Sequence, residues 1–454
     1  MLRGLLFTGA LSALGLVSTH AQTIEFDATI NAAQETTGST SSATGSAILL
    51  YHVTSNTFDL MITLSNFSAT LVASHIHEDP PGVAGPVVTG LGAEAVYTRS
   101  GNTLTATFTN MTYGGTPLTL LQNGAYVNFH TAAWPGGEIR GQLIAKPKRL
   151  VAILNGSNET PANNSAAYGA AYISYNAGTN KITTRIQLYN YTNTLANSHY
   201  HEGAVGVAGP VVHALGGASV YTQTGWSYGA VFVDQTYLGD PIKLLSGGAY
   251  LNVHSNIVPA GEIRGQVMTS DELSVSRVIN VAARGWVGTG DQVLITGFIV
   301  AGNEPVRVIL TAKGPSLATA NVSGPLADPM LSLHDWTGRE IVSNNDFGTG
   351  FASADLVATG YAPTNSKEAA LLLVLPPGLY TVIVSGATGG TGIALAEVYE
   401  ARADANSSPL AYNDSFDGQQ HLRARVNLAS TYRPARRPLE FCVPTPLAVA
   451  SNTR

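Results

Sequence analysis

The sequence predicts an all-β protein: two tandem antiparallel β-sandwich or barrel domains, followed by a third β-sandwich domain. Three observations predict this fold. Apolar and polar residues alternate with a period of two, turn-forming residues separate these short segments, and a long block of sequence occurs twice. No segment shows the period of a long amphipathic helix. Short strands at close spacing are typical of sandwiches and small barrels.

The repeat has a constant offset of 124 residues, so His199 corresponds to His75. The matching blocks are 74–78 and 198–202, 82–88 and 206–212, 125–130 and 249–254, and 137–142 and 261–266. A constant offset means that the two copies differ by no net insertion. A repeat of this length indicates two whole domains, which we place at 22–146 (copy 1) and 149–270 (copy 2), rather than the short units of a solenoid.

Strands are expected wherever the alternation is regular. In the two copies these segments are 57–64, 103–108 and 181–188. Beyond the repeat, a third domain is expected at 278–400, with strands at 292–300, 306–310, 330–334, 379–384 and 393–399. Turn signals at 376–378 and 389–392 separate some of them. The segment 401–454 has no periodicity and is expected to be a disordered or loosely attached tail.

The composition argues against nucleic-acid binding and against disulfides as the source of the domains' stability. Only 11% of the residues are charged, and the formal net charge is −6 with no basic run, which argues against nucleic-acid binding. Cys442 is the one cysteine, so the domains cannot depend on internal disulfides. Their stability must come from core burial, which domains of about 120 residues can supply.

The N-terminus has the pattern of a secretory signal peptide at 1–21. Arg3 supplies the positive start, 5–17 is a short apolar core, and 19–21 is a plausible cleavage site before Gln22. The apolar run is too short to cross a bilayer comfortably. We therefore expect a secreted protein, extracellular or periplasmic, with no membrane span in the mature chain.

Six histidines form the candidate chemistry. His75 and His77 are two residues apart on an expected strand and project from one face. If a neighbouring strand carries His130, three imidazoles converge, and three histidines with an open fourth position suit Zn or Cu. Copy 2 repeats the set as His199, His201 and His254. The alternative is structural: histidines and Asn128 on a sheet face would hydrogen-bond one another and the backbone.

Glu138 and Arg140, repeated as Glu262 and Arg264, are assigned a structural role. Two residues apart on an expected strand, they share a face. An ion pair from Arg140 to Glu78 or Glu35 would connect the last strand to the first half of the domain. Glu78 or Glu138 is also a candidate for orienting a metal-binding histidine.

The motifs H-x-H-E at 75–78, G-V-A-G-P-V-V at 82–88 and G-E-I-R-G-Q at 137–142, present in both copies, resemble the CHRD (chordin-type) domain. The resemblance implies a secreted β-domain. In the third domain, P-G-x-Y-T-V-I-V at 377–384 and G-G-T-G at 389–392 are similar to prepeptidase C-terminal-type domains, which are accessory modules.

Two function classes follow from the sequence. The first is a secreted, non-catalytic binding or structural protein whose partner is an extracellular protein or glycan. The alternative is a Zn- or Cu-binding protein or a metal-dependent oxidoreductase with one three-histidine site per copy. The sequence contains no G-x-S-x-G or H-E-x-x-H motif and no Cys/His nucleophile pair, which favours the first class. It identifies neither the partner nor an oligomeric state.

Overall fold

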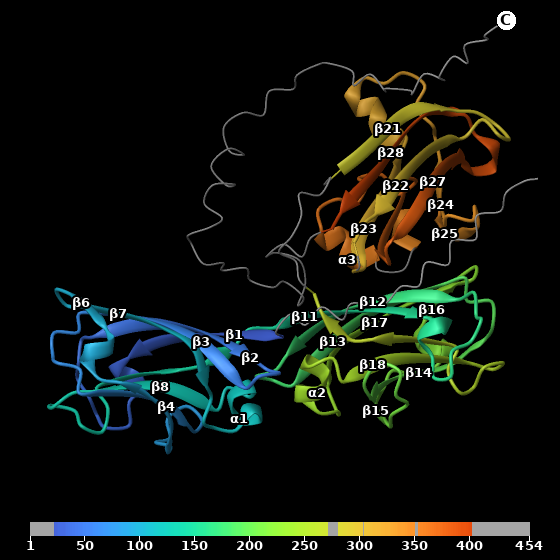
Figure 1. Cartoon of the computed structure of the whole chain (residues 1–454). Helices are drawn as coiled ribbons and strands as arrows, with labels where there is room; N and C mark the ends of the chain where they lie inside the picture. The colour runs from blue at the N-terminus through green and yellow to red at the C-terminus, as the bar shows by residue number, and fades with distance from the viewer. Residues whose placement is uncertain (1–21, 271–279, 303, 350–352, 402–454) are drawn as a thin grey trace, which may run out of the picture. The chain divides into compact units, whose positions relative to one another are not determined.

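The computed structural model describes residues 22–270, 280–302, 304–349 and 353–401, and these are mostly β-strands (Figure 1). The expected signal peptide at 1–21 and all of the expected tail except Ala401 lie outside the described residues. Within the described ranges, no helix has the length and apolar character needed to cross a membrane.

Copy 1 is a single ten-stranded antiparallel sheet that curls into a half-barrel (Figure 1). The strand order is β5-β4-β8-β9-β1-β2-β3-β7-β6, and β10 pairs with β1. Its elements are β1 (Thr23–Asn31), η1 (Ala32–Gln34), β2 (Thr44–His52), β3 (Thr57–Ser65), β4 (Ala73–Glu78), β5 (Val87–Gly92), η2 (Glu94–Val96), β6 (Thr98–Ser100), β7 (Thr103–Thr112), α1 (Pro117–Leu121), β8 (Ala125–His130), β9 (Ile139–Gln142) and β10 (Ile144–Ala145).

Copy 2 repeats this sheet with the order β15-β14-β18-β19-β11-β12-β13-β17-β16, and β20 pairs with β11. Its elements are β11 (Lys148–Asn155), η3 (Gly156–Asn158), β12 (Tyr168–Asn176), β13 (Lys181–Tyr189), β14 (Leu195–Glu202), β15 (Val211–Ala214), η4 (Ala218–Val220), β16 (Thr222–Thr224), β17 (Ser227–Thr236), α2 (Pro241–Leu245), β18 (Ala249–Ser255), β19 (Ile263–Gln266) and β20 (Met268–Thr269). The identical order shows that each copy carries a whole fold.

The third domain consists of two four-stranded antiparallel sheets, β21-β28-β23-β26 and β22-β27-β24-β25. Leu310, Leu331 and Val382 come from different strands of the two sheets and share one core. The elements are β21 (Asn280–Val287), β22 (Leu294–Val300), β23 (Val306–Lys313), η5 (Pro315–Ala320), β24 (Pro329–His334), β25 (Glu340–Asn344), η6 (Phe347–Thr349), α3 (Ser353–Ala358), β26 (Ala369–Leu375), β27 (Gly378–Gly386), η7 (Ala387–Gly389) and β28 (Gly392–Glu400).

The all-β prediction is confirmed, and every strand expected from alternation overlaps a strand of the structure. Other strands, such as β1, β2 and β26, were not named from the sequence, and β26 lacks alternation altogether. In β26 all seven residues, Ala-Ala-Leu-Leu-Leu-Val-Leu, are buried, so neither face is polar. A short continuous apolar run cannot be recognised as a strand by its period.

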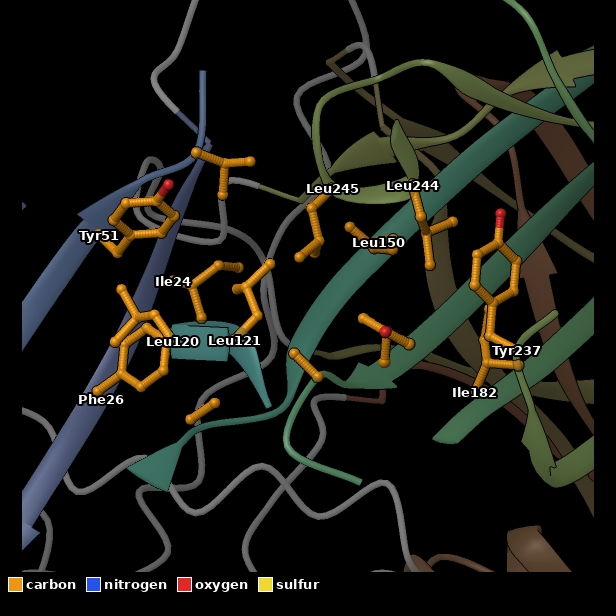
Figure 2. Close-up of a cluster of buried hydrophobic side chains, with 14 of the residues drawn as sticks. Ile24, Phe26, Tyr51, Leu120, Leu121, Leu150, Ile182, Tyr237, Leu244 and Leu245 are labelled. Carbon is orange, nitrogen blue, oxygen red and sulfur yellow. The ribbon is translucent and has the colours of Figure 1, made fainter. Parts of the chain in front are cut away.

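The core of each copy lies on the inner face of its curled sheet. In β1 the inward residues, such as Phe26 and Ile30, alternate with more exposed ones. The short helix α1 adds Leu120 and Leu121, both fully buried (Figure 2). In copy 2, Leu244 and Leu245 of α2 occupy the equivalent positions (Figure 2). Burial of apolar side chains, without disulfides, thus accounts for the stability of both copies.

Strand β8 is buried on both faces, which alternation alone did not indicate. Val127 and Phe129 enter the core as expected. The opposite face carries Tyr126, Asn128 and His130, and the loops before β5 and before β9 contact it through hydrogen bonds to Tyr126 and His130. The polar face of β8 is therefore an enclosed site rather than a solvated surface.

Candidate metal centres

The histidines of copy 1 come together because β4 and β8 are neighbours. In the antiparallel register His75 lies opposite Asn128, His77 opposite Tyr126, and His130 opposite Ala73. His130 is thus diagonal to His75 on the same face, within the reach of long side chains. The ring centroids of His75 and His130 are 5.0 Å apart, and those of His77 and His130 are 5.9 Å apart.

Two backbone carbonyls determine which ring nitrogens are free. The Nδ1 atom of His77 donates to the carbonyl of Gly85 (2.9 Å), and that of His130 donates to the carbonyl of Pro135 (3.1 Å). A carbonyl only accepts hydrogen bonds, so each Nδ1 carries the proton and each Nε2 of the neutral ring keeps a lone pair. Both Nε2 atoms, and Nδ1 of His75, are buried without a hydrogen-bond partner.

These nitrogens are close enough to share a metal ion. One candidate ligand atom from each of the three histidines lies within 4.8 Å of the others. Two nitrogens bound to one Zn²⁺ at about 2.0–2.1 Å each cannot be more than roughly 4.2 Å apart. Small ring movements would therefore complete the site. The three imidazoles leave a further coordination position open, as in catalytic and transport sites for Zn or Cu.

Copy 2 contains the same arrangement. His201 donates from Nδ1 to Gly209 and His254 from Nδ1 to Pro259, at 2.9 and 3.0 Å. The buried nitrogens without a hydrogen-bond partner are again one Nδ1, from His199, and two Nε2 atoms, from His201 and His254.

Burial keeps the clustered imidazoles neutral. It is the largest influence on the pKa of His75, His77 and His130, which are all held below the usual value for histidine. In copy 2, burial and the neighbouring histidines lower the pKa of His199 to about 4. Metal binding requires the neutral form, so these groups are available as ligands over a wide pH range.

The expected ion pair of Arg140 with Glu78 or Glu35 is not formed. The guanidinium lies 3.4 Å from the centroid of the Tyr126 ring and donates to the carbonyl of Val83 and to Gln142. Tyr126 in turn stacks on His77, with centroids 5.0 Å apart. Arg140 therefore supports the site through an aromatic ring rather than through a carboxylate. Arg264 repeats this contact over Tyr250, at 3.5 Å.

Neither candidate carboxylate hydrogen-bonds a histidine. Glu78 accepts from the hydroxyl of Tyr113 and the backbone N–H of Thr116. Glu138 accepts from the hydroxyls of Ser41 and Thr131. In copy 2, Glu262 likewise accepts from neutral side chains.

Sequence reasoning missed the two carbonyls that orient the rings. The signal was present in the repeat, because Gly85 and Pro135 return as Gly209 and Pro259 at the same offset as the histidines. Every residue has a backbone carbonyl, so residue type does not show which carbonyl accepts a hydrogen bond. Only a search for loop residues that repeat at the same offset as the histidines would have found these two.

A comparison with protein-family models gives one match. The CHRD domain model matches residues 26–143 and again 150–267, together more than half of the chain. The chain belongs to the CHRD family. Each CHRD domain contains one histidine triad, and the comparisons indicate no catalytic family.

Two solved structures are distantly similar, and no curated protein matches the sequence. The pre-peptidase C-terminal domain of a collagenase from Bacillus anthracis is 14% identical, covers 26% of this chain and 89% of its own, and has a TM-score of 0.18. The VP2 subviral particle of infectious bursal disease virus is 10% identical, covers 86% of this chain and 73% of its own, and has a TM-score of 0.16.

Proposed function

We propose that this is a non-catalytic metal-binding protein in which each CHRD domain holds one Zn²⁺ or Cu²⁺ ion through three histidines. One observation carries the proposal: in both copies, three buried ring nitrogens without hydrogen-bond partners converge on one point. A purely structural cluster would be expected to pair such atoms, because a buried polar atom without a partner costs about 1–3 kcal/mol. A shared metal ion satisfies all three.

Metal analysis of the full-length chain tests the proposal. After dialysis against Zn²⁺ or Cu²⁺, we expect two ions per chain, because the two triads are in separate domains. His77→Ala and His201→Ala should each retain one ion, and the double variant none. His52→Ala is the matched control, since His52 lies on strand β2 and hydrogen-bonds Thr23 and Asp59 instead. Failure to take up stoichiometric metal at any pH would exclude the proposed function.

We also propose that the protein is exported and that its partner, apart from the metal, is an extracellular protein or glycan. The positive residue, apolar core and cleavage pattern of 1–21 support export. Intact mass measured on protein from the culture medium or periplasm should correspond to a chain that begins at Gln22. Retention of the full chain in the cytoplasm would contradict this proposal.

A further inference from the structure

The two CHRD domains differ at the residue that follows the third histidine, which is Thr131 in copy 1 and Ser255 in copy 2. The Thr131 hydroxyl donates to Oε2 of Glu138 at 2.6 Å. Oε1 of the same carboxylate accepts from Ser41 at 2.7 Å. Glu138 is only 6% exposed, so both bonds form away from water, where a carboxylate bond is strong.

In copy 1 this carboxylate holds the loop between β8 and β9. Thr131 and Trp134 exchange backbone hydrogen bonds, which closes a turn, and the Thr37 hydroxyl donates to the carbonyl of Gly137. Pro135 lies between these fixed points, and its carbonyl accepts the Nδ1 proton of His130. Glu138 therefore acts on the ring of His130 through the loop, without touching it.

In copy 2 the carboxylate keeps the equivalent serine, because Ser165 corresponds to Ser41, but its second partner differs. Glu262 accepts from Ser165 at 2.8 Å and from Asn193 at 3.0 Å. The Ser255 hydroxyl accepts from the backbone N–H of Val258, as the Thr131 hydroxyl does from Trp134, but it does not donate to the glutamate. Asn193 has no copy 1 counterpart of the same type, since Ala69 stands at that position.

In copy 2 Ser255 and Val258 close the equivalent turn, and the loop has a further attachment at Asn256. Asn256 donates from its backbone to Thr194 and accepts from the backbone N–H of Thr194 through Oδ1. The site is correspondingly more open: His130 is 9% exposed, whereas His254 is half-buried. The centroid separation to the first histidine is 5.0 Å in copy 1 and 5.2 Å in copy 2.

We propose that Glu138 is a positioning residue for the copy 1 metal site, and that this site therefore binds its ion more tightly than the copy 2 site. The inference rests on the proposed function, since it compares two sites of that kind. Residues that orient a metal ligand without binding the metal typically change its affinity 10- to 100-fold. We expect a difference of about 10-fold, so that copy 1 fills first.

Titration of Zn²⁺ into full-length variants, in competition with a chelator, measures each site alone. His201→Ala leaves only the copy 1 site and His77→Ala leaves only the copy 2 site, and neither variant alters the loops of the site that remains. We expect the chain with the copy 1 site to have the lower dissociation constant. Equal constants, or tighter binding by copy 2, would overturn the proposal while leaving the metal-binding function intact. If neither variant binds metal, the proposed metal-binding function and the proposed difference between the sites are both wrong.

A matched pair of substitutions tests the carboxylate contact itself. Thr131→Val and Ser255→Ala each remove one hydroxyl at equivalent positions, but only the first removes a bond to the glutamate. In the single-site chains we expect Thr131→Val to weaken Zn²⁺ binding about 10-fold and Ser255→Ala to weaken it much less. Equal losses would contradict a role specific to Glu138.

The tautomer of His130 separates positioning from stability. Nitrogen-15 shifts of the metal-free protein should show one tautomer with the proton on Nδ1, and Thr131→Val should produce a mixture. A variant that is less stable yet keeps a single tautomer would show that Glu138 has only a structural role. If Thr131→Val does not fold, the comparison of the two unaltered sites still decides the proposal.

Discussion

A neutral imidazole has one N–H group and one lone pair, so the acceptor that binds the N–H decides which nitrogen can ligate a metal. The carbonyls of Gly85 and Pro135 bind the N–H groups of His77 and His130, and so leave Nε2 of each ring as the possible ligand atom. The arrangement costs stability in the metal-free protein, because three ring nitrogens are buried without a hydrogen-bond partner. At the scale of residues, the site is therefore a cluster of unsatisfied nitrogens that a metal ion would satisfy.

The histidines should make the metal-free protein sensitive to acid. The pKa of His199 is lowered to about 4, against about 6.5 in an unfolded chain. Between these values the unfolded chain binds more protons, so the free energy of unfolding should fall as pH decreases from about 6.5 to about 4. Urea denaturation at several pH values measures this slope. His199→Gln should flatten it, and an unchanged slope would contradict the assignment.

Glu35 should produce the opposite dependence. Burial raises its pKa to about 7, although Arg140 acts to lower it. The folded protein then binds more protons than the unfolded chain between about 4.5 and about 7, and the contribution of Glu35 to stability is lost as pH rises through that window. Glu35→Gln should remove this loss. Glu340→Gln, at an exposed position in β25, is the control and should leave the pH dependence as it is.

At the scale of elements, the connection between β4 and β5 is built around a close backbone approach. Gly85 lies so near the end of β4 that an added Cβ atom would be 1.9 Å from the carbonyl oxygen of Glu78. Its N–H donates to the hydroxyl of Tyr126, and its carbonyl accepts from His77. Only glycine permits this approach, and the same holds for Gly209 in copy 2.

Gly85→Ala should therefore damage both the fold and the site. Forcing a methyl group against backbone typically costs about 1–3 kcal/mol, and the displaced carbonyl would release the ring of His77. We expect lower thermal stability and loss of one bound ion, with the copy 2 ion retained. Gly90→Ala is the control in the same hairpin, because an added Cβ atom there meets nothing within 4 Å. Similar effects of the two substitutions would argue against a special role for Gly85.

At the scale of the whole molecule, copy 1 carries its complete sheet within its own sequence. Its last strand, β10, pairs with β1, and Lys146 forms ion pairs with Glu25 and Asp27 at the start of the domain. Every strand of this sheet comes from one continuous segment. Copy 1 should therefore fold without the rest of the chain.

A fragment of residues 22–146 tests this independence. It should unfold in one cooperative transition, with circular dichroism and fluorescence giving the same midpoint. A shorter fragment, 22–142, lacks β10 and Lys146 and should be less stable. A fragment 22–146 that is unfolded alone, while the full chain is folded, would show that the domain division at 146 is wrong.

The sequence by itself determined what depends on local pattern. Alternation predicted some of the strands, and the constant offset predicted two equivalent copies that the family match confirms. The spacing of His75 and His77 placed both on one face, since alternate side chains of a strand project together. The motifs were enough to indicate the family, because they recur in a fixed order and at the same offset of 124 residues as the histidines.

Only the tertiary structure decided which residues meet across the chain. The order β5-β4-β8-β9 brings His130 to the histidine pair, and the loops that cover β8 supply the carbonyls of Gly85 and Pro135. Arg140 stacks on Tyr126 instead of pairing with a carboxylate. Periodicity reports the face on which a side chain lies, whereas its partner depends on strand order and loop path, and these are set by contacts between residues far apart in sequence.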